Sequence, residues 1–191
     1  VPPVINHLLS SADCQIQGFL AAGHVCTVTG DTDYQQLARQ YHLPIVITGF
    51  EPLDLLQGIY HCIDQLERGD HQVINAYRHV ARNQGNHLAQ QAMQDVFVII
   101  DQQWRGLGQI AKSGLALSDA YAQWNAQLKF TLPPTNVCEK TTCRIGDILQ
   151  GLITPLDCEH FALTCTPERP LGATMVSSEG ACAAYYRYRQ Y

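Results

Sequence analysis

Apolar and polar positions along the chain follow two periods, one typical of strands and one typical of helices. Short apolar runs occupy 17–24, 43–50 and 71–77. The run LPIVITGF at 43–50 is apolar on both faces, as expected for a parallel strand covered on both sides. Helical spacing of apolar residues marks the segments between them, at 1–13, 31–41, 52–69 and 85–101. This alternation predicts an α/β fold with a layered, Rossmann-like parallel sheet.

Two of these predicted helices have a well-defined apolar face. One begins at Pro52, a residue favoured in a first helical turn, and ends near Gly69. Its inward residues are expected to be Leu55, Ile59, Cys62, Ile63 and Leu66. The other predicted helix, at 85–101, should direct inward Leu88, Ala92, Val96, Ile99 and Ile100.

Beyond residue 101 the periodicity weakens, and KFTLPPTNVC at 129–138 is typical of an extended connector. A cysteine-rich stretch with little periodicity of its own follows. We therefore predict two parts, an α/β domain at 1–131 and a C-terminal, loop-rich segment at 132–191.

Composition limits the classes of function. The 191-residue chain has a formal net charge of −5 with scattered Lys and Arg, which does not favour a nucleic-acid groove or a polybasic membrane patch. It contains neither an apolar run of membrane-spanning length nor a secretory signal. The opening VPPVINHLL lacks an initial methionine, so we expect a processed or truncated piece of a longer, cytoplasmic protein. In a reducing compartment, clustered cysteines more often bind metal or perform redox chemistry than form structural disulfides.

The chain contains eight cysteines. Cys14 and Cys26 flank the first predicted strand, and Cys62 lies on the apolar face of a helix, so we interpret these three as packing residues. Cys138 lies in the proline-rich connector, where its role stays open.

The other four cysteines, Cys143, Cys158, Cys165 and Cys182, form the pattern C-x14-C-x6-C-x16-C. This pattern lacks the closely spaced cysteine pair that structural zinc sites usually contain. An iron–sulfur cluster can take its four thiolates from well-separated loops, and the prolines near Cys158 and Cys165 favour such loops. Cys182 is expected near a helix start with Ser178 as N-cap, where a thiolate is stabilised. Metal binding, redox-active thiols and unlinked structural cysteines all remain open on spacing alone.

Longer motifs carry a resemblance to a known family. The segments GFEPLDLL, WRGLG, CTPERPLGA and MVSSEGACAAYYRY are similar to those of HypD, a family of [NiFe]-hydrogenase maturation factors. The resemblance covers essentially all 191 residues but only the C-terminal part of the family's chain. The family's upstream CGGHTH and CPVC motifs, which supply its reactive thiols, are not in this sequence.

The resemblance implies a [4Fe-4S] cluster held by Cys143, Cys158, Cys165 and Cys182. It also implies a role as scaffold and electron relay during assembly of the Fe(CN)2CO centre, rather than as a free-standing enzyme. The implied partners are the small protein HypC, the cyanide donor HypE and the N-terminal half of the family's own chain.

Two other functions remain as alternatives, a stand-alone [4Fe-4S] thiol oxidoreductase and a zinc-stabilised interaction module.

Three further residues attract a functional interpretation. His24 and Glu51 follow predicted strands, at the edge where ligands of α/β sheets bind. His160 lies two residues after Cys158, but a cluster with four thiolates does not require it as a ligand.

Overall fold

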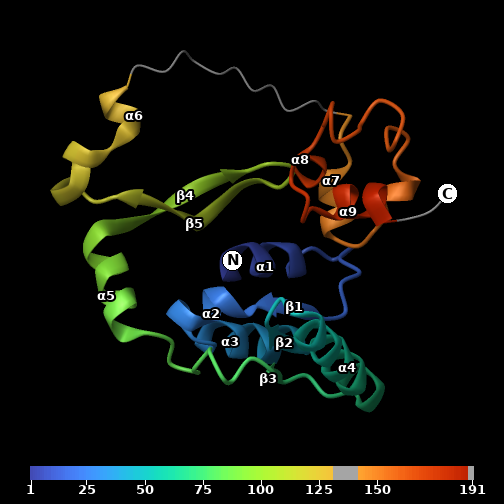
Figure 1. Ribbon diagram of the computed structural model, residues 1–191, viewed down its shortest axis with the longest axis horizontal. Coiled ribbons are helices and arrows are strands. Elements are labelled where there is room, and N and C mark those ends of the chain that lie inside the picture. The colour runs from blue at the N-terminus through green and yellow to red at the C-terminus, as the bar shows by residue number, and fades with distance from the viewer. Residues whose placement is uncertain (131–141, 189–191) are drawn as a thin grey trace.

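The computed structural model describes residues 1–130 and 142–188 (Figure 1). A three-stranded parallel sheet has the strand order β1 (Phe19–Ala22), β2 (Ile45–Thr48), β3 (Val73–Asn75). Five helices accompany it, α1 (Pro2–Leu9), α2 (Gly23–Thr29), α3 (Thr32–Tyr41), α4 (Pro52–Arg68) and α5 (His87–Val96). The predicted α/β class and the parallel sheet are confirmed, whereas α2 was not predicted from the sequence.

The central strand β2 organises the core of this sheet. Ile45, Val46 and Ile47 have no exposed surface, which confirms that the strand is covered on both faces. Ile45 and Ile47 belong to a core shared with α1 and α3. Thr48 points to the opposite face, where it contacts Gly58 of α4 and donates a 2.7 Å hydrogen bond to a backbone carbonyl of that helix.

Helix α4 has the predicted extent, but only part of the predicted inward face is confirmed, since Cys62 is half-buried against Gly18 directly before β1. Its buried residues are Gly58 and Gln65, and the glycine lets the helix backbone approach the Thr48 side chain closely. The apolar residues expected to face inward are 37–52% exposed at Leu55, Ile59, Ile63 and Leu66. Periodicity identified an apolar face correctly but could not show that most of this face, apart from Cys62, stays exposed.

The helix predicted at 85–101 was wrong beyond Val96. Residues Phe97–Trp104 form strand β4, which pairs antiparallel with β5 (Gly108–Leu117) in a hairpin. The inward positions predicted for that helix are accordingly wrong, since Leu88 is 81% and Ile99 68% exposed. A continuous run of β-branched and apolar residues fits either period, and pairing with the next strand in a hairpin decided the outcome.

The hairpin reaches from the α/β part to the C-terminal segment, and its turn lies beside α7 (Ile145–Leu149) (Figure 1). At that turn Gly106 approaches Ile145 so closely that a side chain would not fit. A second connection is a 2.9 Å hydrogen bond from the backbone N–H of Gln15 to the carbonyl of Gln150. The cysteine-rich part is therefore attached to the α/β part at two places.

The remaining elements are short. They are the 3-10 helices η1 (Asp119–Trp124) and η2 (Pro155–Asp157) and the helices α6 (Ala126–Lys129), α8 (Ala173–Val176) and α9 (Ala181–Tyr188). The predicted domain boundary near residue 131 and Cys138 lie outside the described residues. None of the helices within the described ranges has the length and apolar composition needed to cross a membrane.

The three scattered cysteines behave as predicted. Cys26 is buried, Cys14 and Cys62 are half-buried, and none of the three forms a disulfide. Cys26 lies in the main core together with Tyr34 and Ile47. These thiols therefore contribute to packing.

Burial of Cys26 makes the stability of the α/β part sensitive to alkaline pH. Burial, assisted by the charge of Asp31, raises the pKa of the Cys26 thiol from 9.0 to about 11. Between these values the unfolded chain releases the proton while the folded chain retains it. The free energy of unfolding should therefore fall as pH rises from 9 to 11. Below pH 9 the thiol is protonated in both states, so it makes the free energy of unfolding no more dependent on pH there.

Denaturant titrations at several pH values test this expectation. The Cys26→Ala variant should lose part of the alkaline decrease, while the half-buried control variant Cys14→Ala should retain it. An identical pH dependence in both variants would show that Cys26 does not carry the effect.

Candidate functional site

The C-terminal segment has a small core of its own, in which cysteines replace ordinary apolar residues. Its buried members are Phe161, Cys165, Met175, Cys182 and Ala183. Cys158 packs against this core from one side. Little regular structure surrounds it, so local turns and short helices determine where the thiols lie.

Two of the cysteines lie next to short helical elements. Cys143 lies two residues before α7, and Cys158 follows η2. A capping interaction fixes the start of η2, because the Asp157 carboxylate accepts hydrogen bonds from both the backbone N–H and the hydroxyl of Thr154, at 2.8 and 2.7 Å. The direction in which the chain reaches Cys158 is thereby set.

The other two cysteines lie in a tight turn and at a helix start. The backbone N–H of Cys165 donates a 2.8 Å hydrogen bond to the carbonyl of His160, which closes the turn between Cys158 and Cys165. Cys182 is the second residue of α9. The predicted N-cap at Ser178 is wrong, because α9 begins at Ala181 and the chain before it is still in a turn.

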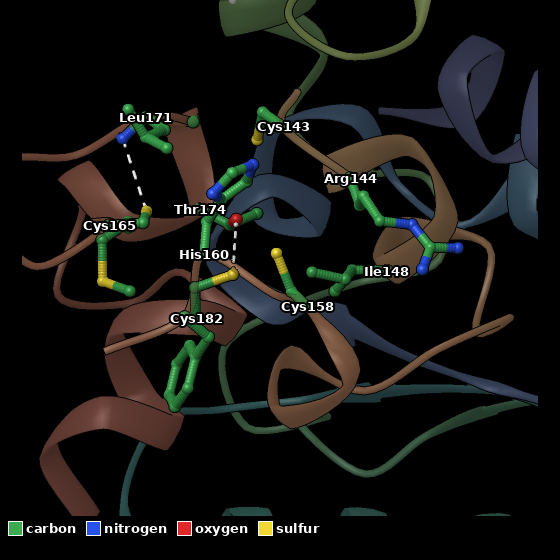
Figure 2. Close-up of a pocket in the computed structure, with 12 residues that line it drawn as sticks. Cys143, Arg144, Ile148, Cys158, His160, Cys165, Leu171, Thr174 and Cys182 are labelled. Carbon is green, nitrogen blue, oxygen red and sulfur yellow. Dashed lines mark hydrogen bonds between the residues drawn. The ribbon is translucent and has the colours of Figure 1, made fainter. Parts of the chain in front are cut away.

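All four cysteines line one cavity, together with His160 and apolar residues of the small core (Figure 2). The structure thus brings together the complete C-x14-C-x6-C-x16-C set. In this conformation the cavity has a volume of about 20 Å³, and its exposed lining is almost entirely apolar. Within the described ranges, no three His, Cys, Asp or Glu side chains are already arranged as a metal site. The thiols therefore share one cavity without having the final geometry of bound ligands.

Hydrogen-bond donors reach two of the sulfur atoms. The hydroxyl of Thr174 donates to Cys182 Sγ at 3.0 Å, and the backbone N–H of Leu171 donates to Cys165 Sγ at 3.4 Å. Burial raises the pKa of Cys182 above its usual value, Thr174 opposes this shift, and the neighbouring Cys165, Cys143 and Cys158 raise it further. The mutual repulsion of four thiolates is the electrostatic problem that a bound cation would solve.

The backbone at Gly172 also adapts to the thiols. A side chain at this position would collide with Cys143 Sγ. Only glycine lets the loop after Leu171 pass so close to the sulfur.

Sequence reasoning missed Gly172, Leu171 and Thr174. Leu171 and Gly172 belong to the CTPERPLGA motif, and Thr174 follows directly after it. The motif alone does not show which sulfur atom each of these residues contacts.

The donor set suits an iron–sulfur cluster. Four cysteine thiols on separate loops are the usual ligands of a [4Fe-4S] cluster, and backbone and hydroxyl donors directed at sulfur are its usual surroundings. Gly172 lets the loop backbone pass directly beside the sulfur of Cys143. The residues present therefore fit such a group.

The other candidate residues lie away from this cavity. His24 is in the first turn of α2, with its ring 5.1 Å from that of Phe50. Glu51 occupies the N-cap position of α4, but its side chain makes no capping hydrogen bond. Neither residue contributes to the cysteine site.

Taken together, the chain is an α/β protein with a separate cavity lined by four thiols. A sequence model of the HypD family, described as "Hydrogenase formation hypA family", matches residues 1–189. The chain therefore belongs to the HypD family. It is 46% identical over 189 residues to the hydrogenase maturation factor HypD of Escherichia coli K12, covering 98% of this chain and 51% of that protein.

Two further relatives have a similar coverage. Hydrogenase maturation factor HypD2 of Bradyrhizobium diazoefficiens is 40% identical over an alignment of 197 positions that covers 100% of this chain and 52% of the relative. HypD of Cupriavidus necator is 39% identical, again over 100% of this chain and 52% of the relative. The chain spans about half the length of the curated relatives it matches.

The close approach at Gly172 predicts a local effect of substitution. In a Gly172→Ala variant, the added methyl group should displace Cys143 from the cavity and raise its rate of alkylation, measured by mass spectrometry. The control variant Gly69→Ala should cost roughly 1 kcal/mol in stability through its left-handed backbone, but its methyl group enters open space and Cys143 should react as before. Equal reactivity of Cys143 in both variants would contradict the proposed contact.

Proposed function

We propose that this chain is an iron–sulfur scaffold and electron relay that acts in the assembly of the Fe(CN)2CO centre of [NiFe]-hydrogenases, in the cytoplasm. The observation that carries the proposal is that Cys143, Cys158, Cys165 and Cys182 line a single cavity. Membership of a family whose named members are hydrogenase maturation factors supports the biological setting.

In this proposal the four thiolates hold a [4Fe-4S] cluster. When bound, the cluster supplies one-electron transfer. Thr174 and Leu171 stabilise negative charge on the sulfur atoms of Cys182 and Cys165. Phe161 and Met175 exclude water from the site.

The iron that receives cyanide and carbon monoxide is the substrate of the assembly reaction. All four thiols of the cavity are occupied by the cluster, so the ligands of the substrate iron come from elsewhere. In the proposal they come from HypC and from the N-terminal half of the family's chain, and HypE provides the cyanide. The chain is accordingly an assembly factor with a redox role.

An apolar surface on α4 supports docking of the N-terminal half. Leu53, Leu56, Tyr60 and Ile63 recur at helical spacing and are 52–65% exposed, so they form one outward stripe. A stripe of this kind is characteristic of a buried interface. Because the relatives are about twice as long as this chain, the half that it does not match is a natural occupant of this surface.

Metal analysis tests the cluster. After anaerobic purification, the chain should contain iron and acid-labile sulfide in a ratio near one. Replacing any of the four cavity cysteines by Ser should abolish most of the iron. The control variant Cys62→Ala should keep the iron while losing on the order of 1 kcal/mol in stability.

Other outcomes of the same analysis identify the alternatives. Zinc without sulfide would indicate the zinc-stabilised interaction module. An intact cluster together with reduction of a disulfide substrate by this chain alone would indicate the stand-alone thiol oxidoreductase. Either result would overturn the assembly role.

Complementation tests the docking of the N-terminal half. In cells without the full-length factor, this chain alone should not restore hydrogenase activity, whereas both halves supplied as separate chains should. The double variant Leu53→Gln, Leu56→Gln should bind the N-terminal half at least tenfold more weakly, because each leucine loses about 1.5 kcal/mol or more of apolar burial.

A matched control separates docking from folding. Both leucines are already 65% exposed, so the double variant should unfold at nearly the same denaturant concentration as the original chain. Leu88→Gln, on an exposed position of α5, should leave binding unchanged. Activity restored by this chain alone, or unaltered affinity of the double variant, would contradict the proposed docking.

A further inference from the structure

His160 presents a polar atom to the cysteine cavity without a partner inside the protein. Its Nδ1 lies 3.1 Å from the hydroxyl oxygen of Thr164. Its Nε2 is shielded from solvent and has no hydrogen-bond partner. The nearest carboxylate, that of Glu159, is 3.7 Å from Nε2, which is too far for a hydrogen bond. A buried ring nitrogen without a partner is costly unless something binds beside it.

The ring lies among the thiols. His160 is one of the residues that line the cavity with the four cysteines. In Figure 2 its imidazole lies between Thr174 and Cys143, with one nitrogen directed toward the Cys143 sulfur. Its position in the chain is fixed by the hydrogen bond from the Cys165 N–H to the His160 carbonyl, so the ring is held by the same turn that places two of the cysteines.

Thr164 and the charge of the cavity together select the tautomer. When the Thr164 hydroxyl donates to Nδ1, the ring proton resides on Nε2 and points into the cavity. A cavity that contains four thiolates attracts an N–H group and repels a nitrogen lone pair. His160 is therefore suited to donate a hydrogen bond there.

We propose that His160 donates a hydrogen bond from Nε2 to a sulfur atom of the bound cluster or of its cysteine ligands, and so raises the reduction potential of the cluster. It would join Thr174 and the Leu171 N–H as a third donor to sulfur. Donors of this kind stabilise the more negative, reduced form. In this proposal His160 acts as a hydrogen-bond donor to sulfur and does not bind iron itself. This inference rests on the proposed cluster.

The experiment uses the chain purified anaerobically with its cluster. Variants are His160→Leu, which removes the donor, His160→Gln, which keeps an N–H donor, and Thr164→Val, which removes the hydroxyl that selects the tautomer. The control is His71→Leu, on an exposed histidine whose one recorded partner among the described residues is His42. Iron and sulfide content is measured first, followed by a potentiometric titration monitored by EPR and by pulsed EPR of protein with 15N-labelled histidine.

We expect every variant to retain iron and sulfide. In His160→Leu, the reduction potential of the cluster should fall by up to about 59 mV, which for one electron is a tenfold decrease in the equilibrium constant for reduction. His160→Gln should lose less, Thr164→Val should shift in the same direction, and His71→Leu should match the original chain. A weak 15N coupling should disappear in His160→Leu.

Other results would overturn the inference in distinguishable ways. Loss of one iron per cluster in His160→Leu, with a strong nitrogen coupling in the original chain, would make His160 a ligand. An unchanged potential in both His160→Leu and Thr164→Val, with full iron content, would show that the ring does not act on the cluster. Absence of iron and sulfide from the original chain would instead reject the proposed cluster, and the inference with it.

Discussion

The C-terminal segment depends on one constraint, because the cysteines that line its cavity also build its core. Cys165 and Cys182 are buried together with Phe161 and Met175, and the described elements of this segment are helices of at most eight residues. The thiols therefore cannot move without disturbing the packing that holds the segment together. Metal binding and folding are coupled under such conditions, since the ligands must lose protons and adopt one geometry at the same time. The raised pKa of Cys182 shows the electrostatic side of this coupling.

The α/β part has a conventional apolar core that is separate from the cysteine-lined core. Strand β2 is covered on both faces, and its core with α1 and α3 is made of ordinary apolar residues. The turn at Gly106 and the hydrogen bond from Gln15 to Gln150 attach the cysteine segment to this rigid support. The cysteine cavity therefore keeps a fixed position relative to whatever binds the α/β part, as the proposed electron transfer would require.

Sequence reasoning succeeded where local pattern and tertiary environment agree. The strand at 45–48 was predicted because its β-branched run is short and lies between Pro44 and Gly49. The helix that begins at Pro52 was predicted because its apolar residues recur at helical spacing as far as Gly69. Sequence reasoning failed at Phe97–Trp104, where an apolar run that fits either period pairs with the following strand β5 in a hairpin. The family motif identified the four cysteines, but not the donors Thr174 and Leu171, because their directions toward sulfur arise only after the loops have folded.

The positions of the two proposed activities suggest how they are kept apart. Every residue that lines the thiol cavity comes from 143–182, so this site is complete within the C-terminal segment. The outward apolar stripe of α4, by contrast, belongs to the α/β part, and the hairpin adds exposed apolar residues such as Val98 and Ile99. A partner that covers these surfaces does not have to enter the cavity. If the proposal holds, cluster loading and partner docking can proceed independently, and docking would determine only how close the proposed cluster lies to the thiols it is proposed to reduce.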